Sequence, residues 1–122
     1  MNPRTTFEIP TGLTRDARKL AYAIRNYLSS EGVEDTSSCR AFYSPGEWRD
    51  RGEQYGTRSA LVVVYDGNGV APYFSLDATA PPWSKPEAYH RYEAMISLCR
   101  EYGFYFEEAT GWYACIYPIG GA

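Results

Sequence analysis

Two segments of this chain carry apolar residues at the spacing that gives a helix one buried face, and they constrain the fold more than any other feature. The first covers residues 15–30, and its apolar positions are Ala17, Leu20, Ala21, Ile24, Tyr27 and Leu28. Thr14 is placed to cap the first turn, and Gly32 is placed to end the helix. Because such a helix has only one apolar face, it needs a second layer to pack against.

The second helix is predicted from the sequence SKPE at residues 84–87, which has the form of a capping box with proline at the first helical position. This helix runs to Tyr102 and is closed by Gly103. Its expected buried stripe is Ala88, Tyr92, Met95, Ile96, Cys99 and Tyr102. His90, the single histidine, falls on the outer face, which favours a surface residue over a catalytic base or a metal ligand.

Short strands are predicted between and after the helices. CRAFYS at residues 39–44 is typical of a strand, and LVVV at residues 61–64 is typical of a central strand covered on both faces. The sequence DGNG at residues 66–69 can reverse the chain into a return strand over residues 70–76, which Pro72 places at an edge or a bulge. FYFEEATGWYACIYPI then closes the chain as two strands around a turn near Thr110 and Gly111.

The order of these elements predicts an α+β fold: helix, strand, insert, two strands, helix, two strands. In the simplest arrangement, two helices pack side by side on one face of a five-stranded, mainly antiparallel sheet. A chain of 122 residues has the usual size of one domain, so residues 1–122 are expected to form a single domain. Residues 1–12 are expected to be an extended N-terminal segment.

Residues 44–58, SPGEWRDRGEQYGTR, form an insert between two predicted strands. Ser44 to Glu47 has the form of a capping box and predicts a short helical turn, which Gly52 and Gly56 keep from continuing. A long irregular connection in a compact domain is usually functional or mobile, so the insert is a candidate binding element. The candidate residues are Trp48, Arg49, Arg51, Tyr55 and Arg58. The alternative is that Trp48 fills the core and that the charges keep the connection soluble.

The outer face of the first helix carries a basic stripe. Its members lie three or four residues apart, with Lys19 beside them, and are Arg15, Arg18, Tyr22 and Arg25. This stripe is a second candidate binding surface, and its alternative is an ordinary solvated helix face.

Charge and composition narrow the classes of partner. Residues 1–61 hold nine Arg or Lys against eight acids, and residues 62–122 hold three against seven, so neither part has the basic excess that binding to a phosphate backbone requires. The charge distribution therefore disfavours nucleic acid as a partner. No stretch has the length and apolarity of a membrane span, and the first residues lack the pattern of a signal peptide, so the expected compartment is the cytoplasm.

Cysteine usage and motifs give no support for catalysis or for a metal site. Cys39, Cys99 and Cys115 are odd in number and widely spaced, which favours reduced, buried thiols over a disulfide framework or a zinc site. None of them lies in a recognisable nucleophile motif, and Glu107 and Glu108 point to opposite faces of a predicted strand. The sequence therefore predicts no catalytic residue, no metal and no cofactor.

Aromatic residues favour a binding function. The chain has twelve tyrosines, three tryptophans and five phenylalanines, more rings than two helices and five short strands can bury, and Tyr, Trp and Arg are enriched at binding surfaces. In general style the chain resembles accessory proteins of phages and other mobile elements, many of which bind and inhibit a host protein, although no residue is carried over from that resemblance. The leading prediction is a non-enzymatic protein-binding module. The alternative is a binder of a small anionic ligand such as a nucleotide, held by the insert arginines, and an enzyme of unknown class comes third.

Overall fold

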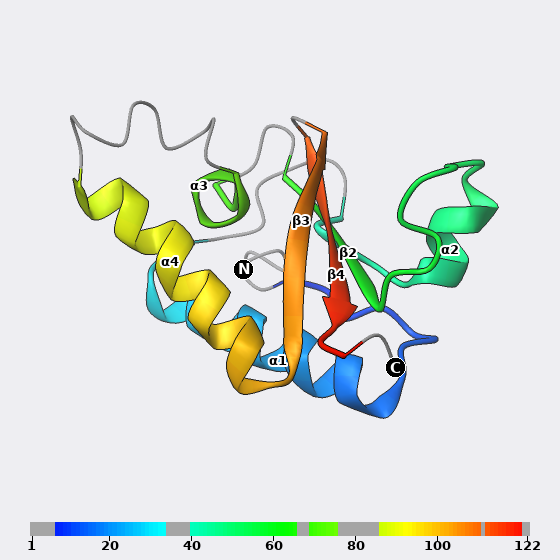
Figure 1. Ribbon diagram of the computed structural model, residues 1–122, viewed down its shortest axis with the longest axis horizontal. Coiled ribbons are helices and arrows are strands. Elements are labelled where there is room, and N and C mark those ends of the chain that lie inside the picture. Colours follow the sequence, from blue (N-terminus) through cyan, green and yellow to red (C-terminus); the bar gives the residue numbers. More distant parts are fainter. Residues whose placement is uncertain (1–6, 34–39, 66–68, 76–85, 111, 121–122) are drawn as a thin grey trace, which may run out of the picture.

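The computed structural model describes residues 7–33, 40–65, 69–75, 86–110 and 112–120. Within these residues the chain has an α+β fold with four helices and an antiparallel sheet of four strands (Figure 1). The helices are α1 (Arg15–Ser30), α2 (Pro45–Asp50), α3 (Ala71–Phe74) and α4 (Pro86–Glu101). The strands are β1 (Phe42–Tyr43), β2 (Leu61–Val64), β3 (Phe104–Thr110) and β4 (Tyr113–Pro118). The strand order across the sheet is β1-β2-β4-β3.

The helices cover both faces of the sheet, not one. In Figure 1 the edge strand β3 is in front, with α3 and α4 to the left of the strands and α2 to the right. Alternate residues of β2 divide between the two faces. Leu61 and Val63 belong to the larger cluster of buried residues, whereas Val62 and Val64 belong to a smaller one around Trp48. The prediction that residues 61–64 form a central strand covered on both faces is therefore confirmed.

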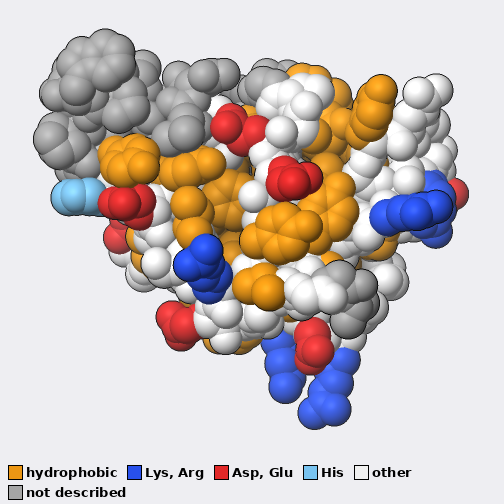
Figure 2. Space-filling model, in the orientation of Figure 1, with side chains coloured by type: hydrophobic (Ala, Val, Ile, Leu, Met, Phe, Trp, Pro, Cys, Tyr) orange, Lys and Arg blue, Asp and Glu red, His pale blue; other side chains and the backbone are white. Residues whose placement is uncertain are grey.

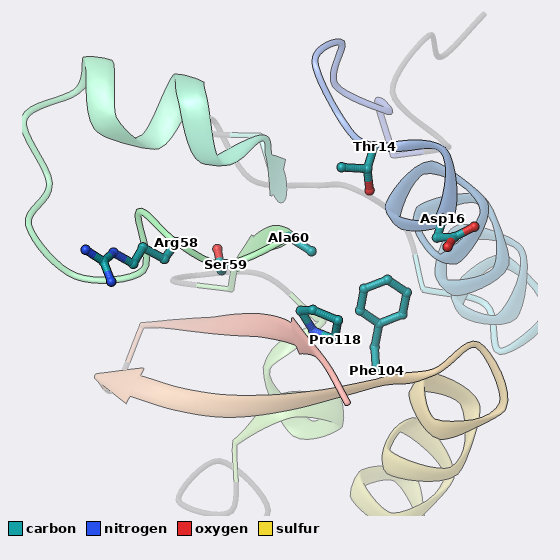
Figure 3. Close-up of a pocket in the computed structure, with 7 residues that line it drawn as sticks. All are labelled: Thr14, Asp16, Arg58, Ser59, Ala60, Phe104 and Pro118. Carbon is teal, nitrogen blue, oxygen red and sulfur yellow. The ribbon is translucent and has the colours of Figure 1, made fainter. Parts of the chain in front are cut away.

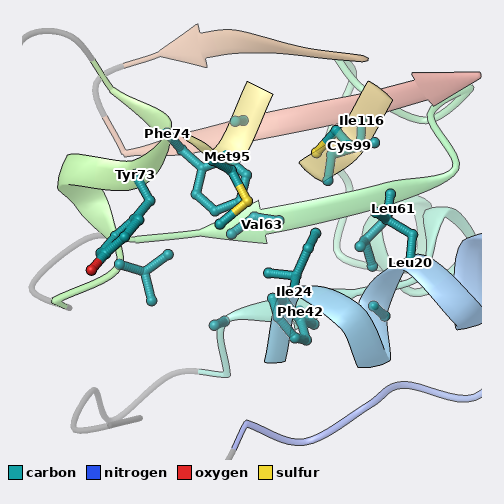
Figure 4. Close-up of a cluster of buried hydrophobic side chains, with 14 of the residues drawn as sticks. Leu20, Ile24, Phe42, Leu61, Val63, Tyr73, Phe74, Met95, Cys99 and Ile116 are labelled. Atoms are coloured by element: carbon teal, nitrogen blue, oxygen red, sulfur yellow. The ribbon is translucent and has the colours of Figure 1, made fainter. Parts of the chain in front are cut away.

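The larger cluster forms the main core, where side chains of α1, α3 and α4 meet those of the strands (Figure 4). Helix α1 contributes Leu20 and Ile24, and α4 contributes Met95 and Cys99, all of them fully buried. The larger cluster also takes in Phe7, whose ring centre lies 5.7 Å from that of Phe42. This core holds the helices against the strands and leaves the smaller cluster to hold α2.

The predicted hairpin over residues 61–76 is wrong. Residues 70–76 were expected to form a return strand, but Ala71–Phe74 form the helical turn α3, and the described residues give the sheet four strands. A return strand would have to pair with β2, but β1 pairs with β2 on one side and β4 pairs with it on the other. Pro72 suits the first turn of a helix, and the turn buries Tyr73 and Phe74 in the main core. The residues expected to reverse the chain at 66–68 lie outside the described part.

The two long helices were predicted closely. Helix α1 has the predicted bounds, and the amide of Ala17 donates to the Thr14 hydroxyl at 3.2 Å. Helix α4 has a buried stripe at Met95 and Cys99, and His90 is exposed as predicted. Tyr102 was expected in that stripe but is 42% exposed, because α4 ends at Glu101 and the chain then turns into β3. Residues 84 and 85, the side chain of Ala88 and residues 1–6 lie outside the description. The closing pair of strands is confirmed as β3 and β4.

Candidate functional site

Trp48 fixes the insert to the second face of the sheet. Its side chain is fully buried, and its indole Nε1 donates to the backbone carbonyl of Tyr55 at 2.8 Å. It packs with Val62, Val64, Tyr113 and Cys115 in the smaller cluster. The expectation that Trp48 is displayed for binding is therefore wrong, because the apolar second face of β2 needs a cover and Trp48 supplies it.

The turn that carries Trp48 forms as predicted. The Glu47 amide donates to the Ser44 hydroxyl at 3.2 Å, and the Ser44 amide donates to the Glu47 carboxylate at 3.0 Å, which completes a capping box. Arg40 adds an ion pair to the same carboxylate at 2.8 Å. Burial alone would raise the pKa of Glu47, but the Ser44 amide and the Arg40 guanidinium outweigh it, so the pKa lies below its ordinary value. The start of the insert is thus rigidly held.

Arginines lie over aromatic rings beside this turn. The Arg51 Cζ atom is 4.5 Å from the ring centre of Trp48 and 5.2 Å from that of Tyr43. Arg40 lies over the same Tyr43 ring at 4.4 Å. Glu53 forms a further ion pair with Arg51 at 3.4 Å. Stacking and pairing therefore hold the exposed Arg51 guanidinium in one place.

Among the large hydrophobic side chains of the described residues, Tyr55 is the most exposed, with 73% of its surface accessible. The backbone carbonyl of Tyr55 accepts the hydrogen bond from Trp48, so the backbone that carries the exposed ring is held in place. Trp112 is half-buried, 5.9 Å from Trp48 between ring centres. We refer to the residues that contact Trp48 or the Tyr43 ring beside it as the insert surface, which consists of Arg40, Tyr43, Arg51, Tyr55 and Trp112.

The remaining insert arginines do not converge on a shared pocket. Arg49 donates to the backbone carbonyl of Thr57 at 3.1 Å. Arg58 borders a hollow of about 450 Å³ together with Thr14, Asp16, Ser59, Ala60, Phe104 and Pro118. The Arg58 guanidinium points away from Phe104 and Pro118 (Figure 3), and the lining includes an acidic residue, Asp16. This arrangement offers little attraction to an anion.

The basic stripe on α1 exists, but it lies apart from the insert surface. The guanidinium carbons of Arg18 and Arg25 lie 5.5 and 4.7 Å from the ring centre of Tyr22. Arg15 and Arg18 are exposed, and Tyr22 and Arg25 are half-buried. The structure therefore does not bring the nine sequence-predicted site residues together. Arg51 and Tyr55 belong to the insert surface, with Trp48 as its buried support, whereas Arg15, Arg18, Tyr22 and Arg25 lie on α1. Arg49 and Arg58 belong to neither group.

Three members of the insert surface were not predicted from the sequence: Arg40, Tyr43 and Trp112. One signal was available, since neighbouring strand residues face opposite sides and Phe42 was a natural core residue. Tyr43 therefore had to lie on the second face with Trp48. No comparable signal pointed to Arg40 or Trp112, and the position of Trp112 depends on contact with Trp48, which is distant in the chain.

Two cysteines lie in the described residues, and both are buried free thiols. Burial raises the pKa of Cys99 to about 12 and that of Cys115 to about 11. Cys39 lies outside the described part. In the unfolded chain each thiol ionises near its ordinary pKa of 9.0, whereas the buried thiols of the folded protein remain protonated at that pH. Their contribution to the free energy of unfolding is therefore complete below that pH and is lost as the pH rises toward 11 and 12.

These thiols are expected to be unreactive in the folded protein, since the thiolate is the nucleophile and burial disfavours it. In a Cys39→Ser variant, iodoacetamide at about pH 8 should leave Cys99 and Cys115 unmodified, and should label both after unfolding in guanidinium chloride. Mass spectrometry of the intact protein counts the added groups. Rapid labelling of either thiol without denaturant would contradict the assignment of both as core residues.

Comparisons with models of protein families, with curated proteins and with solved structures found no match for this chain. Among the helices of the described residues, none combines the length and the apolar character needed to cross a membrane. In the same residues, no three His, Cys, Asp or Glu side chains gather where they could hold a metal ion. The insert surface is therefore the feature of the described residues that best indicates a function.

Proposed function

We propose that this protein is a non-enzymatic protein-binding module and that the insert surface recognises the partner. The observation that carries the proposal is the fully buried Trp48, which fixes the insert to the sheet while Arg51 and Tyr55 remain exposed above it. Binding costs less free energy when the contacting side chains are already ordered. Arginine and tyrosine are among the residues enriched at interface hot spots.

The same geometry favours a protein partner over a small anion. A small-ligand site is normally concave and surrounds its ligand with a few convergent polar groups. Arg49 and Arg51 already contact Thr57 and Glu53, and the Arg58 guanidinium points away from Phe104 and Pro118 in the lining of the hollow. A broad surface with separate anchors fits a protein better than it fits a nucleotide.

The test compares two pairs of substitutions with the same chemistry. Arg51→Ala with Tyr55→Ala alters the insert surface, and Arg18→Ala with Tyr22→Ala alters the stripe on α1. Tagged forms of the parent and of both variants are used to recover partners from the native host, and the recovered proteins are quantified by mass spectrometry. We expect one host protein to be recovered by the parent and by the stripe variant, and to be lost with the insert variant.

With that protein purified, we expect the insert variant to bind at least about tenfold more weakly, mainly through faster dissociation. The stripe variant should change mainly the association rate and its salt dependence. The insert variant should lose no more than about 1 kcal/mol of unfolding free energy, because both side chains are exposed. Equal binding by the parent and the insert variant would overturn the proposal, and a small molecule bound in native mass spectrometry would favour the alternative.

A further inference from the structure

The outer edge of β3 is open in the part of the chain that the structure describes. Strand β3 is last in the order β1-β2-β4-β3, and β4 is its only partner among the described residues (Figure 1). The amide of Ile119 donates to the carbonyl of Gly103 at 2.8 Å. This hydrogen bond shows that the backbone groups of Gly103, next to the start of β3, face β4. Since inward and outward residues alternate in an antiparallel ladder, the backbone groups of Phe104, Phe106 and Glu108 point to the outer edge.

Aromatic rings flank this edge on both faces of the sheet. On one face Tyr105 stacks on Tyr117, with ring centres 5.7 Å apart, and Tyr105 is 41% exposed. On the other face Phe106 is half-buried, and its ring centre lies 5.6 Å from that of Tyr92 on α4. Figure 2 shows hydrophobic side chains gathered over the strands at the centre of the molecule, with acidic side chains among them. An added strand would find apolar contacts for side chains on both of its faces.

The charge of the edge selects the kind of strand it can accept. Glu107 and Glu108 are exposed, and neither forms an ion pair with another described residue. Because they point to opposite faces, both faces of an added strand would meet a carboxylate. The register shift between Glu108 and Thr110 interrupts the ladder, so the regular edge ends there.

We propose that the outer edge of β3 receives an extended, basic segment of a partner protein as an additional strand. The segment would carry Lys or Arg at the two adjacent positions opposite Glu107 and Glu108, and apolar residues opposite Phe106 and Tyr105. Backbone hydrogen bonds would supply affinity and the side chains would supply selectivity. This site is separate from the insert surface and does not depend on it.

Self-pairing of two β3 edges is the competing occupant, and charge disfavours it. Pairing two copies would bring four carboxylates, from Glu107 and Glu108 of each chain, onto one pair of strands, and each chain already has a net charge of −3. Charged side chains on edge strands are a common means of preventing such association. The same carboxylates attract a basic strand, so one feature excludes a second copy and favours the proposed occupant.

Peptide binding tests the proposal directly. The probe is the fluorescein-labelled peptide Thr-Lys-Lys-Val-Val-Thr, and binding is followed by fluorescence anisotropy. We expect saturable binding to the parent, and binding about tenfold weaker or more to a Glu107→Lys, Glu108→Lys variant. A second peptide with both lysines replaced by glutamate should show the opposite preference. Circular dichroism and the melting temperature confirm that the variant is folded.

N-methylation of the peptide backbone separates strand addition from simple charge attraction. In an added strand, alternate amides face β3 and the others face away. Peptides methylated at successive residues should therefore alternate between weak and unchanged binding. Uniform sensitivity along the peptide, or no binding to the parent, would overturn the proposal.

Sedimentation of the parent protein measures its oligomeric state and tests whether two copies pair through β3. We expect a monomer, whereas a dimer that the Glu107→Lys, Glu108→Lys variant abolishes would show that a second copy occupies the edge and would overturn the proposal. An Arg51→Ala, Tyr55→Ala variant should bind the peptide normally. The two proposals can therefore fail separately. If the peptide does not bind, the proposed role of the insert surface is unaffected, and if the insert surface binds no partner, the proposed strand addition at β3 is unaffected.

Discussion

Replacing Trp48 with alanine is expected to lower the free energy of unfolding by about 3 to 5 kcal/mol, because it empties the centre of the smaller buried cluster. The indole lies among the rings of Tyr43, Trp112 and Tyr113, at 4.9 to 5.9 Å between centres. It also donates the hydrogen bond to Tyr55 that holds the end of the insert, and the substitution leaves that carbonyl without this donor. Guanidinium chloride unfolding, followed by tryptophan fluorescence and circular dichroism, measures the change.

Two control variants divide that loss into its parts. Trp48→Phe keeps an aromatic ring but removes the indole N–H, so it should fall between the parent and Trp48→Ala. Arg49→Ala removes an exposed neighbour on the same turn and should cost less than about 1 kcal/mol. If Trp48→Ala were as stable as Arg49→Ala, the indole would not be a core residue, and the insert would lack the support that the proposed binding role requires.

The helices show which parts of this fold can be predicted from residues close together in the sequence. Helix α1 has the predicted bounds because an apolar stripe, a capping threonine and a following glycine all agree on the same residues. The capping box at Ser44 also formed as predicted, since it needs only atoms within four residues. Where several local signals coincide, the sequence is sufficient.

Residues 70–76 show where local sequence is insufficient. A short apolar run is compatible with a strand or with a helical turn, and periodicity alone does not separate them. The pairing of the sheet excludes a strand beside β2 here, because β1 and β4 occupy both sides of β2. Those pairings join residues far apart in the chain, so no pattern within residues 61–76 could have revealed them.

The position of Trp48 could have been inferred, but only by reasoning across segments. The run at residues 61–64 predicted a strand covered on both faces, whereas both long helices were assigned to one face. Val62 and Val64 therefore needed another apolar cover, and Trp48 is a large apolar residue in the preceding insert. The exposed members of the insert surface are harder to infer, because the exposure of Tyr55 depends on the hydrogen bond that its own carbonyl accepts.

The second large effect is expected from Gly56→Ala, which should lower the free energy of unfolding by about 2 to 5 kcal/mol. Gly56 has φ of +83°, a conformation that costs an alanine about 1 to 2 kcal/mol. A Cβ atom there would also meet the sulfur of Cys115, and would lie 3.5 Å from Nε1 of Trp48. The substitution would therefore push the insert away from β4 at the point where Trp48 holds it.

Gly52 provides a matched control for the backbone part of this effect. Its φ is +91°, but a Cβ atom added there meets nothing within 4 Å, so Gly52→Ala should cost only about 1 to 2 kcal/mol. The difference between the two variants measures the close approach to β4. Adding Cys115→Ala to Gly56→Ala removes the obstructing sulfur, so the pair should be less destabilising than the sum of the single changes. Equal losses for Gly52→Ala and Gly56→Ala, with additive behaviour of the pair, would mean that the insert does not pack against β4 as the structure has it.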